Sequence, residues 1–407
     1  MAKKDTTKTK SVERPNRLVS RIIRSTNARS KKDIQQWRVA LQQAENIATP
    51  KRTLLYNIYN EISLDAHLSA EIERRLNAVL SSQFELFDTE GSPLPEASAL
   101  LRKKWLRKFI QYSWESILWG NSLIEIDSLT PEGLIADVRL INRWHVRPET
   151  GIVVVNQADD KGIDYREDKK YAPWLFEVGD IDNLGLLNKC IPHVIFKRFA
   201  QSAYSEYCEV LGIPPRVLKT KSFDTEHLNR SEDMLANMST NSYAVIGEDE
   251  EITFVNPGAS DGTIFTNLFR ISSNEISKLI GGAIVGEDSQ QGSRAKEQVS
   301  LELTKTTIDA DKQMITGIIN DYLLPRLIEL GYPFADATFE FNQEKNLKEE
   351  LDNALRIAQQ FEMDQEGIDY MNKTFGVPVV KQKAQPSFGG VSPEGNATAK
   401  DVNDFFG

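Results

Sequence analysis

Long helical periodicity is the feature that most constrains how this 407-residue chain can fold. From Gln298 to Leu330, apolar residues recur at spacings of three and four, which predicts one long helix. Two further amphipathic helices are predicted at 195–211 and 264–280. Such apolar faces need a partner surface, either within one chain as a bundle or between chains as a ring-shaped homo-oligomer. The residues predicted to share one face of the long helix are Leu301, Ile308, Ile315, Ile318, Ile319 and Tyr322.

Composition excludes several classes of protein. Apolar residues make up 40% of the chain and aromatic residues 9%, enough for the core of one large or two ordinary domains. No apolar run approaches the ~20 residues of a membrane-spanning helix, and no apolar segment follows the N-terminal MAKKDTTKTK as it would in a secretory signal. The two cysteines, Cys190 and Cys208, are too few for a disulfide framework and are typical of a reducing compartment. Membrane, secreted and collagen-like classes are therefore excluded, and no membrane partner is expected.

Charge is distributed unevenly along the chain. Residues 1–32 hold eleven basic and two acidic side chains, whereas the whole chain carries −10. Residues 33–407 are therefore strongly acidic, and the first 45 residues are predicted to form an exposed basic arm. Such an arm could contact nucleic acid or an acidic protein surface, or it could be a solubilising terminus without a specific partner.

The first half of the chain is predicted to be helical and then β-rich. A helical pair spans 53–86, with Ser63 and Asp65 as candidate caps of its second helix. A strand follows in SSQFELFD, then a helix from about Glu96 to Trp119 that Gly120 stops, then a strand in SLIEID. From 134 to 196 the short apolar stretches VRLINRWHVRP, GIVVVN, YAPWLFEVG and CIPHVIFKRF predict further strands.

The second half contains a compact insertion and a polar end. Between the two amphipathic helices, GIPP is followed by a polar helix at 225–238 and by strands in SYAVIG and EITFVN. This insertion could pair with a neighbouring copy by edge addition, or it could be self-contained. A helical, acidic pair is predicted at 347–375, and the composition after Val380 is typical of a disordered tail.

No constellation of residues indicates catalysis. The four histidines are scattered without metal-ligand spacing, and Cys208 is predicted to be a buried, inert thiol on an amphipathic helix. The stretch GGAIVGEDSQQGSR has the glycine spacing of a phosphate loop, but carboxylates stand where Lys and Ser/Thr are needed. Asp309 and Asp311, two apart on a helix, are predicted to lie on a solvated face. We therefore expect no enzyme activity, no metal and no cofactor. The histidines are His67, His145, His193 and His227.

Several segments, in order, resemble bacteriophage portal proteins, particularly the Mu-type portal family. LLYNIYNEISLDAHLSAEIERRLNAVLSSQFEL (54–86) resembles the first wing helices, in which an Asp and a later Arg recur, here Asp65 and Arg74 or Arg75. FIQYSWESILWGNSLIEI (109–126) resembles the next helix–Gly–strand element, and FKRFAQSAYSEYCEVLGIPPRVLK (196–219) the helix that ends in G-x-P. NEISKLIGGAIV and GSRAKEQVSLELTKTTIDADKQMITGIINDYLLPRLIELGYP resemble the shared C-terminal core.

The resemblance implies an α+β portal fold, assembled as a ring oligomer. The chain is then divided as follows: basic N-terminal arm 1–45, wing 46–193, stem helix 194–211, αβ clip 212–257, stem helix 258–283, tunnel loop 284–297, wing long helix and strand 298–345, small helical crown 346–380 and disordered tail 381–407.

The resemblance also implies a function and partners. Family members form dodecameric rings at one capsid vertex, through which double-stranded DNA is packaged and ejected. They dock terminase, adjoin the major capsid protein and later hold tail adaptor or connector proteins. The implied location is the portal vertex of the virion, with the host cytoplasm during assembly.

The implied contacts with DNA lie in the tunnel loop and the stem. Cationic contacts bind phosphate tightly, so a mostly acidic wall suits a duplex that must slide. Taken without the resemblance, the loop is more typical of an ordinary surface linker between two helices. The candidate loop residues are Ser289, Gln290, Gln291, Gly292, Ser293, Arg294 and Lys296, and the candidate stem residues are Lys197, Arg198, Arg270 and Lys278.

Two alternatives to the portal remain at this stage. One is a nucleic-acid-binding adaptor or scaffold that acts through the basic arm, in which case deletion of residues 1–32 abolishes DNA binding. The other is a hydrolase or nuclease with unrecognised carboxylates, which predicts metal-dependent cleavage of DNA.

Overall fold

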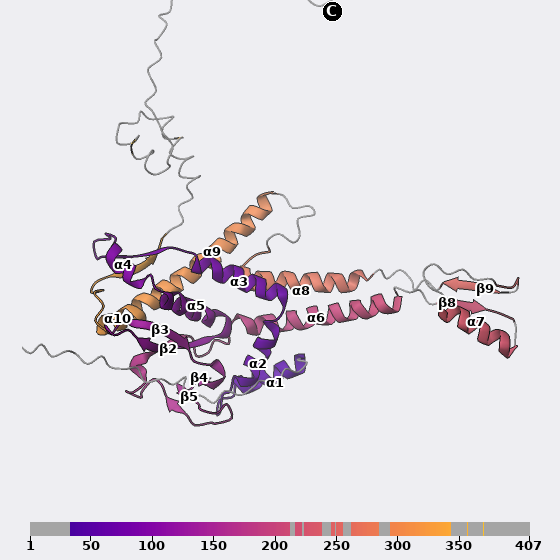
Figure 1. The fold of residues 1–407 in the computed structure, drawn as a ribbon, viewed down its shortest axis with the longest axis horizontal. Helices are drawn as coiled ribbons and strands as arrows, with labels where there is room; N and C mark the ends of the chain where they lie inside the picture. The colour runs from indigo at the N-terminus through magenta and orange to yellow at the C-terminus, as the bar shows by residue number, and fades with distance from the viewer. Residues whose placement is uncertain are drawn as a thin grey trace, which may run out of the picture. The chain divides into compact units, whose positions relative to one another are not determined.

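A computed structural model gives the fold of the chain (Figure 1). It divides into two compact units, residues 1–342 and 343–407. The structure describes residues 33–342 apart from gaps at 212–215, 222–223, 238–245, 249, 255–261 and 285–293, together with Arg356 and Asp369. The predicted arm up to residue 32, the strand in SYAVIG except its last two residues, and the crown and tail apart from those two residues therefore lie outside the described part.

Three helices open the described chain: α1 (Ile34–Ala44), α2 (Thr53–Ile62) and α3 (Ala66–Leu80). The predicted cap is confirmed, because the Asp65 carboxylate accepts a hydrogen bond from the N–H of Leu68 at 3.0 Å and so satisfies a free donor in the first turn of α3. Helix α2 buries five side chains, among them Tyr56 and Tyr59, so it is an internal element.

Two helices replace the single one predicted between Glu96 and Trp119. They are α4 (Pro95–Leu101) and α5 (Lys104–Trp119). Gly120 ends α5 as predicted, with φ of +85°. A Cβ at this position would lie 2.1 Å from the carbonyl oxygen of Asn183, so both the backbone conformation and the space require glycine.

A three-stranded antiparallel sheet packs against α5. Its order is β3–β2–β7, with β2 (Asn121–Leu129) between β3 (Ile135–Leu140) and β7 (Leu175–Gly179). Strand β2 is buried on both faces over its first seven residues. A second small sheet joins β4 (Val146–Arg147), β5 (Ile152–Val153) and β6 (Ile163–Asp164) over its own apolar cluster.

The next element is a long helix, and here one prediction was wrong. Helix α6 (Leu186–Leu211) includes the whole of CIPHVIFKRF, which was predicted as a strand. Cys190, Ile191 and Val194 are buried on one face of the helix, whereas Phe196 and Phe199 of the same run are exposed, so the run has apolar residues on more than one side. A continuous apolar run does not distinguish a buried strand from a buried helix. Pro192 lies inside α6.

Helix α8 (Thr263–Gly281) packs along α6, and Figure 1 shows the two helices running side by side. The buried residues of α6 are concentrated in its first half and those of α8 in its second half, so the helices run in opposite directions. Between them the chain forms β8 (Arg216–Lys219), α7 (Thr225–Asn237) and β9 (Glu251–Phe254). Strands β8 and β9 pair antiparallel, from Arg216 opposite Phe254 to Lys219 opposite Glu251.

The predicted long helix is broken near its C-terminal end. Helix α9 (Arg294–Ile318) continues into a π-helical turn (Ile319–Leu323) and then α10 (Leu324–Glu329). The amide of Asn320 in this turn hydrogen-bonds both the N–H and the carbonyl of Phe339 in β10 (Thr338–Phe341). Strand β10 pairs antiparallel with β1 (Phe84–Phe87), so the last described strand of this unit pairs with the first.

The predicted face of the long helix is only partly buried. Ile315 and Ile319 are fully buried in the main core, and Ile308 and Ile318 pack against it. Leu301 and Tyr322 are exposed, which contradicts a single uniform stripe. No helix in the described part of the chain is long and apolar enough to cross a membrane.

Candidate functional site at the base and outer halves of the α6–α8 helix pair

A buried ion pair anchors the end of α8 to the helical body. The guanidinium of Arg75 donates two hydrogen bonds to Asp311, each of 2.7 Å, and a third of 2.6 Å to the carbonyl oxygen of Ile280. The indole of Trp114 donates to the same carboxylate at 2.8 Å. Helices α3, α5, α8 and α9 therefore meet at one carboxylate and one guanidinium.

This ion pair corrects one prediction and sharpens another. Asp311 is only 3% exposed, so it does not lie on a solvated face, whereas Asp309 keeps half of its side chain exposed. Of the two arginines that the family resemblance offered, Arg75 makes the buried pair and Arg74 pairs locally with Glu71. The sequence holds no local sign of the Arg75–Asp311 contact, because its partners are 236 positions apart.

A second set of polar contacts lies about one helical turn along α8 from this ion pair. Nε2 of His67 lies 3.0 Å from the carbonyl oxygen of Ser273 and 2.9 Å from the hydroxyl of Ser277. The Ser277 hydroxyl also lies 3.3 Å from Glu71, to which it donates a hydrogen bond. His67 is thus packed against α8, as expected of a structural histidine, and it fixes α3 against the buried half of α8.

Two cations connect α6 to the same region. Nζ of Lys197 lies 2.9 Å from the Asp65 carboxylate, and Arg198 pairs with Glu61. Burial alone would raise the pKa of Asp65, but the hydrogen bond from Leu68 and the ammonium of Lys197 stabilise the charged form and hold the pKa below its ordinary value. Lys197 is buried, so this candidate stem residue has a structural partner within the subunit.

The other candidate stem residues lie on the same two helices. Arg198 is on α6, while Arg270 and Lys278 are exposed on α8. Lys278 forms an ion pair of 2.7 Å with Glu275 on its own helix.

The outer halves of the two helices expose apolar side chains. Ile264 is 70% exposed and Ile271 56% exposed on α8, and Phe199 is 63% exposed on α6. Aromatic contacts join the helices here, with Tyr207 of α6 5.9 Å from Phe265 of α8 between ring centroids. The pair is therefore packed internally, yet it leaves an apolar surface facing outward. Exposed apolar patches on a folded subunit mark interaction sites.

The first half of α9 is largely exposed, with Ser300, Thr304 and Thr307 partly covered. Residues 297–307 contain no buried side chain, although this segment includes Val299, Leu301 and Leu303, each more than half exposed. Apolar residues of a helix that the described part of the subunit leaves uncovered need another surface.

The candidate tunnel loop is shorter than predicted. Helix α9 begins at Arg294, so Arg294 and Lys296 belong to its first turn and not to a loop that ends at 297. The other candidate loop residues, Ser289 to Ser293, lie outside the described residues.

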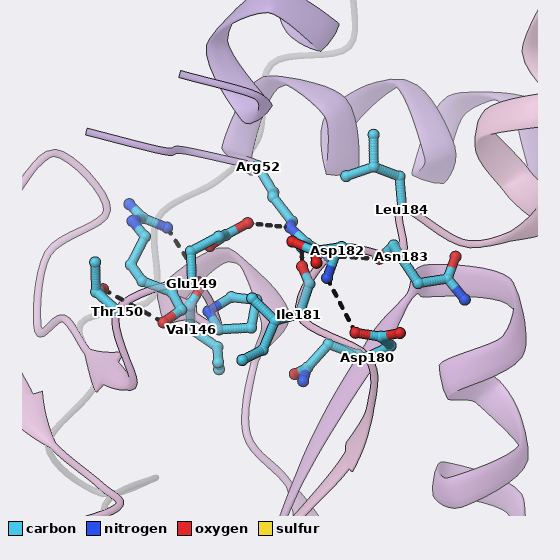
Figure 2. A network of polar contacts seen from close by, with 12 residues as sticks. Arg52, Val146, Glu149, Thr150, Asp180, Ile181, Asp182, Asn183 and Leu184 are labelled. Carbon is cyan, nitrogen blue, oxygen red and sulfur yellow. Dashed lines mark hydrogen bonds and ion pairs between the residues drawn. The ribbon is translucent and has the colours of Figure 1, made fainter. Parts of the chain in front are cut away.

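Figure 2 shows how the β-rich part is attached to the helical body through Arg52. This residue immediately precedes α2 and is almost fully buried. Its guanidinium forms an ion pair of 2.5 Å with Glu149 and donates hydrogen bonds to the carbonyl oxygens of Ile181 and Asn183. Arg52 therefore joins the small sheet and the loop before α6 to the same rigid unit.

No candidate metal cluster of His, Cys, Asp and Glu is found among the described residues. Burial raises the pKa of the Cys190 thiol to about 12, which makes this cysteine inert. Cys208 was predicted to be buried, and this was wrong: it is exposed on the outer half of α6, where no described residue buries it.

Solved structures with the same fold define the class. A chain in the neck of an empty gene transfer agent (GTA) particle, computed with C6 symmetry, has a TM-score of 0.54 to this protein at 10% identity, covering 86% of this chain and 100% of that one. A chain of the virion of a native gene transfer agent particle has a TM-score of 0.50 at 11% identity, with the same coverage. The fold is therefore one found in gene transfer agent particles.

Sequence comparison then gives the family. The model for the portal protein of Mu bacteriophage matches residues 56–377, so this chain belongs to that family. It is also 22% identical over 307 residues to the portal protein of Escherichia phage Mu, covering 69% of this chain. The chain spans 57% of the length of that relative. The resemblance to the Mu-type portal family is confirmed. The match also favours a portal over an adaptor that acts through residues 1–32.

Proposed function

We propose that this protein is a portal, the head–tail connector that forms a ring at one vertex of a phage capsid. Copies of the chain enclose a channel through which double-stranded DNA is packaged and later ejected. The role is non-enzymatic: the subunit supplies a shaped, mostly acidic wall, and the energy for DNA movement comes from a terminase docked on the ring.

The observation that carries this proposal is the uncovered apolar surface on α6, α8 and the first half of α9. A ring gives every copy two neighbours, so heterologous contacts cover these faces in all subunits at once. A soluble monomer would leave Ile264, Phe199 and Leu301 in water, at about 25 cal/mol for each Å² of apolar surface left uncovered.

The domain assignments follow from the family fold. We propose that α6 and α8 form the stem, that β8, α7 and β9 belong to the clip, and that the remaining described elements form the wing. Family membership supports a dodecamer, with the major capsid protein and tail adaptors as further partners. The subunit would assemble in the host cytoplasm and remain at the portal vertex of the virion.

The residues proposed to lie near DNA are those of the tunnel loop and the exposed cations of the stem. Ser289 to Ser293 offer amide and hydroxyl groups, which hold phosphate less firmly than cations do. Arg294 and Lys296, at the start of α9, would flank the loop. On the stem we retain Arg270 and Lys278 as the exposed candidates, whereas Lys197 is buried against Asp65 and Arg198 is only partly exposed.

Negative-stain microscopy of the purified full chain tests the proposal directly. We expect rings with a central opening wide enough for a duplex. A chain that stays monomeric across protein and salt concentrations, with no ring in any class average, would contradict the portal role.

A further inference from the structure

A pocket of about 160 Å³ lies between α3, α5 and the β1–β10 pair, away from the α6–α8 helices. Its size suits one side chain, because an apolar cavity of ~150 Å³ is large enough to take up a benzene ring. The pocket is open to solvent on one side, so such a side chain could enter from outside. Its apolar wall includes Val79, Leu80, Phe84, Leu106, Ile110 and Phe341.

The rim of this pocket is strongly basic. Arg102, Lys103 and Arg107 line it, and Lys104 is the next exposed residue. These cations lie in a sequence, RKKWLRK, within a chain whose residues after 32 are strongly acidic overall. The positive charge at this pocket is therefore opposite in sign to the net charge of the chain.

The placement of these cations is unfavourable for the subunit itself. Helix α5 starts at Lys104, has no acidic residue in its first turn and no side-chain cap from Lys103. Cations near a helix N-terminus oppose the helix dipole, whereas anions there are stabilising. An unfavourable placement of charge that does not stabilise the folded subunit is expected at a functional site, such as a binding site.

The subunit does little to neutralise the rim. Arg102 lies 3.6 Å from Glu85 in an exposed pair, a contact that contributes little. Lys103, Lys104 and Arg107 have no carboxylate within ion-pair distance in the part of the chain that the structure describes. The rim therefore offers positive charge to an incoming anion.

We propose that this pocket binds a short acidic segment of a partner protein, with one aromatic side chain inserted between α3, α5 and β10 and flanking carboxylates on the basic rim. One ligand can use both the apolar cavity and the basic rim: its aromatic ring fills the cavity, and its Asp or Glu side chains pair with Lys103 and Arg107. A nucleic-acid backbone would use the cations but has no group for the cavity, so we favour a peptide over DNA. The proposal does not depend on ring formation.

Fluorescence anisotropy with labelled peptides tests this site on the full chain. The probes are GDEDFEDEG and the matched peptide GDEDAEDEG, which differ only in the aromatic residue. We expect the Phe peptide to bind at least tenfold more tightly than the Ala peptide. We also expect Lys103→Glu with Arg107→Glu to weaken binding of the Phe peptide at least tenfold.

A matched control separates this site from overall charge. Lys161→Glu with Lys189→Glu changes the net charge equally at two exposed lysines elsewhere and should leave binding within twofold of wild type. Thermal unfolding of both double variants should match the wild type, because all four side chains are exposed.

Three results would overturn the proposal. Equal binding of the two peptides would remove the role of the cavity. Displacement of the Phe peptide by a short DNA duplex at lower concentration than by unlabelled peptide would assign the rim to nucleic acid. A change in oligomer mass in Lys103→Glu with Arg107→Glu, but not in the control, would assign the surface to contacts between copies of this chain.

Discussion

The two halves of α8 lie in opposite environments, although they belong to one helix. From Ser272 to Gly281 most side chains are buried, and the helix end is held by Arg75 and by His67. From Thr263 to Ile271 most side chains are exposed, including the apolar Ile264 and Ile271. Helix α9 repeats the contrast, with Asp311 and Ile315 buried and Leu301 exposed.

This difference separates the forces that fold the subunit from those that assemble it. In the inner halves, apolar burial and satisfied polar groups stabilise the single chain. In the outer halves, several apolar side chains are not covered by the described part of the subunit, and we propose that another copy covers them. Substitutions in the two halves should therefore affect different measurements.

The largest loss of subunit stability is expected for Asp311→Asn. This change leaves the buried guanidinium of Arg75 without its counter-charge, and breaking a buried ion pair costs about 3–5 kcal/mol. Denaturant unfolding measures the loss. The matched control is Asp309→Asn, whose half-exposed carboxylate lies 3.9 Å from Lys312, a long contact that should contribute less than about 1 kcal/mol. Equal losses in the two variants would show that the inner network does not hold the subunit.

A somewhat smaller loss is expected for Ile276→Ala in the inner half of α8. Ile276 is fully buried in the main core, and truncation of such a side chain costs about 2–5 kcal/mol through lost burial and the cavity left behind. The unfolding midpoint in urea should fall without a change in slope. A loss below about 1 kcal/mol would mean that α8 is not packed against the body as described.

The contact between α3 and α6 gives a prediction with a pH dependence. Asp65→Asn keeps the helix cap but removes the charge that faces Lys197, so we expect a loss of about 2–3 kcal/mol at neutral pH. Because the pKa of Asp65 is held below its ordinary value of 3.8, its contribution is present above that pH and is lost as the pH falls through the lower folded value. The stability difference between wild type and variant should therefore shrink in acid. A difference that is constant from neutral pH to below 3 would contradict the assigned ion pair.

The smallest effect on the subunit is expected for Ile271→Ala in the outer half of α8. Ile271 is 56% exposed, and surface substitutions usually change the free energy of unfolding by less than about 0.5 kcal/mol. The same change should weaken association between copies, measured by the protein concentration at which oligomers dissociate. Loss of subunit stability comparable to that of Ile276→Ala would remove the contrast between the two halves.

The sequence predicts local features of this fold well. The cap at Asp65 and the stop at Gly120 depend on residue chemistry within one turn, and both are found in the structure. The helix at 264–280 follows from apolar spacing, and the structure extends it only from 263 to 281.

Features that depend on distant partners were missed. The pairing of Asp311 with Arg75 and Trp114 has no local pattern in the sequence. The spacing of Asp309 and Asp311 therefore led to the wrong prediction that both carboxylates face solvent. The start of α6 was missed because it is a continuous apolar run that contains Pro192, and a proline is disfavoured in a helix interior. Cys208 lies on the outer half of α6, on a side that no described residue of the subunit buries, and helical spacing alone does not show this.

The most direct test is the particle mass of a variant that changes only the exposed half of α9. We expect wild type to form particles many times the subunit mass of 46.0 kDa, and Leu301→Glu with Leu303→Glu to yield single subunits with an unchanged unfolding midpoint. The control, Gln298→Glu with Thr306→Glu, adds the same charge at exposed polar positions of the same helix and should retain the wild-type mass. Full-sized particles from the Leu301→Glu, Leu303→Glu variant would contradict the claim that these outer halves join one copy to the next.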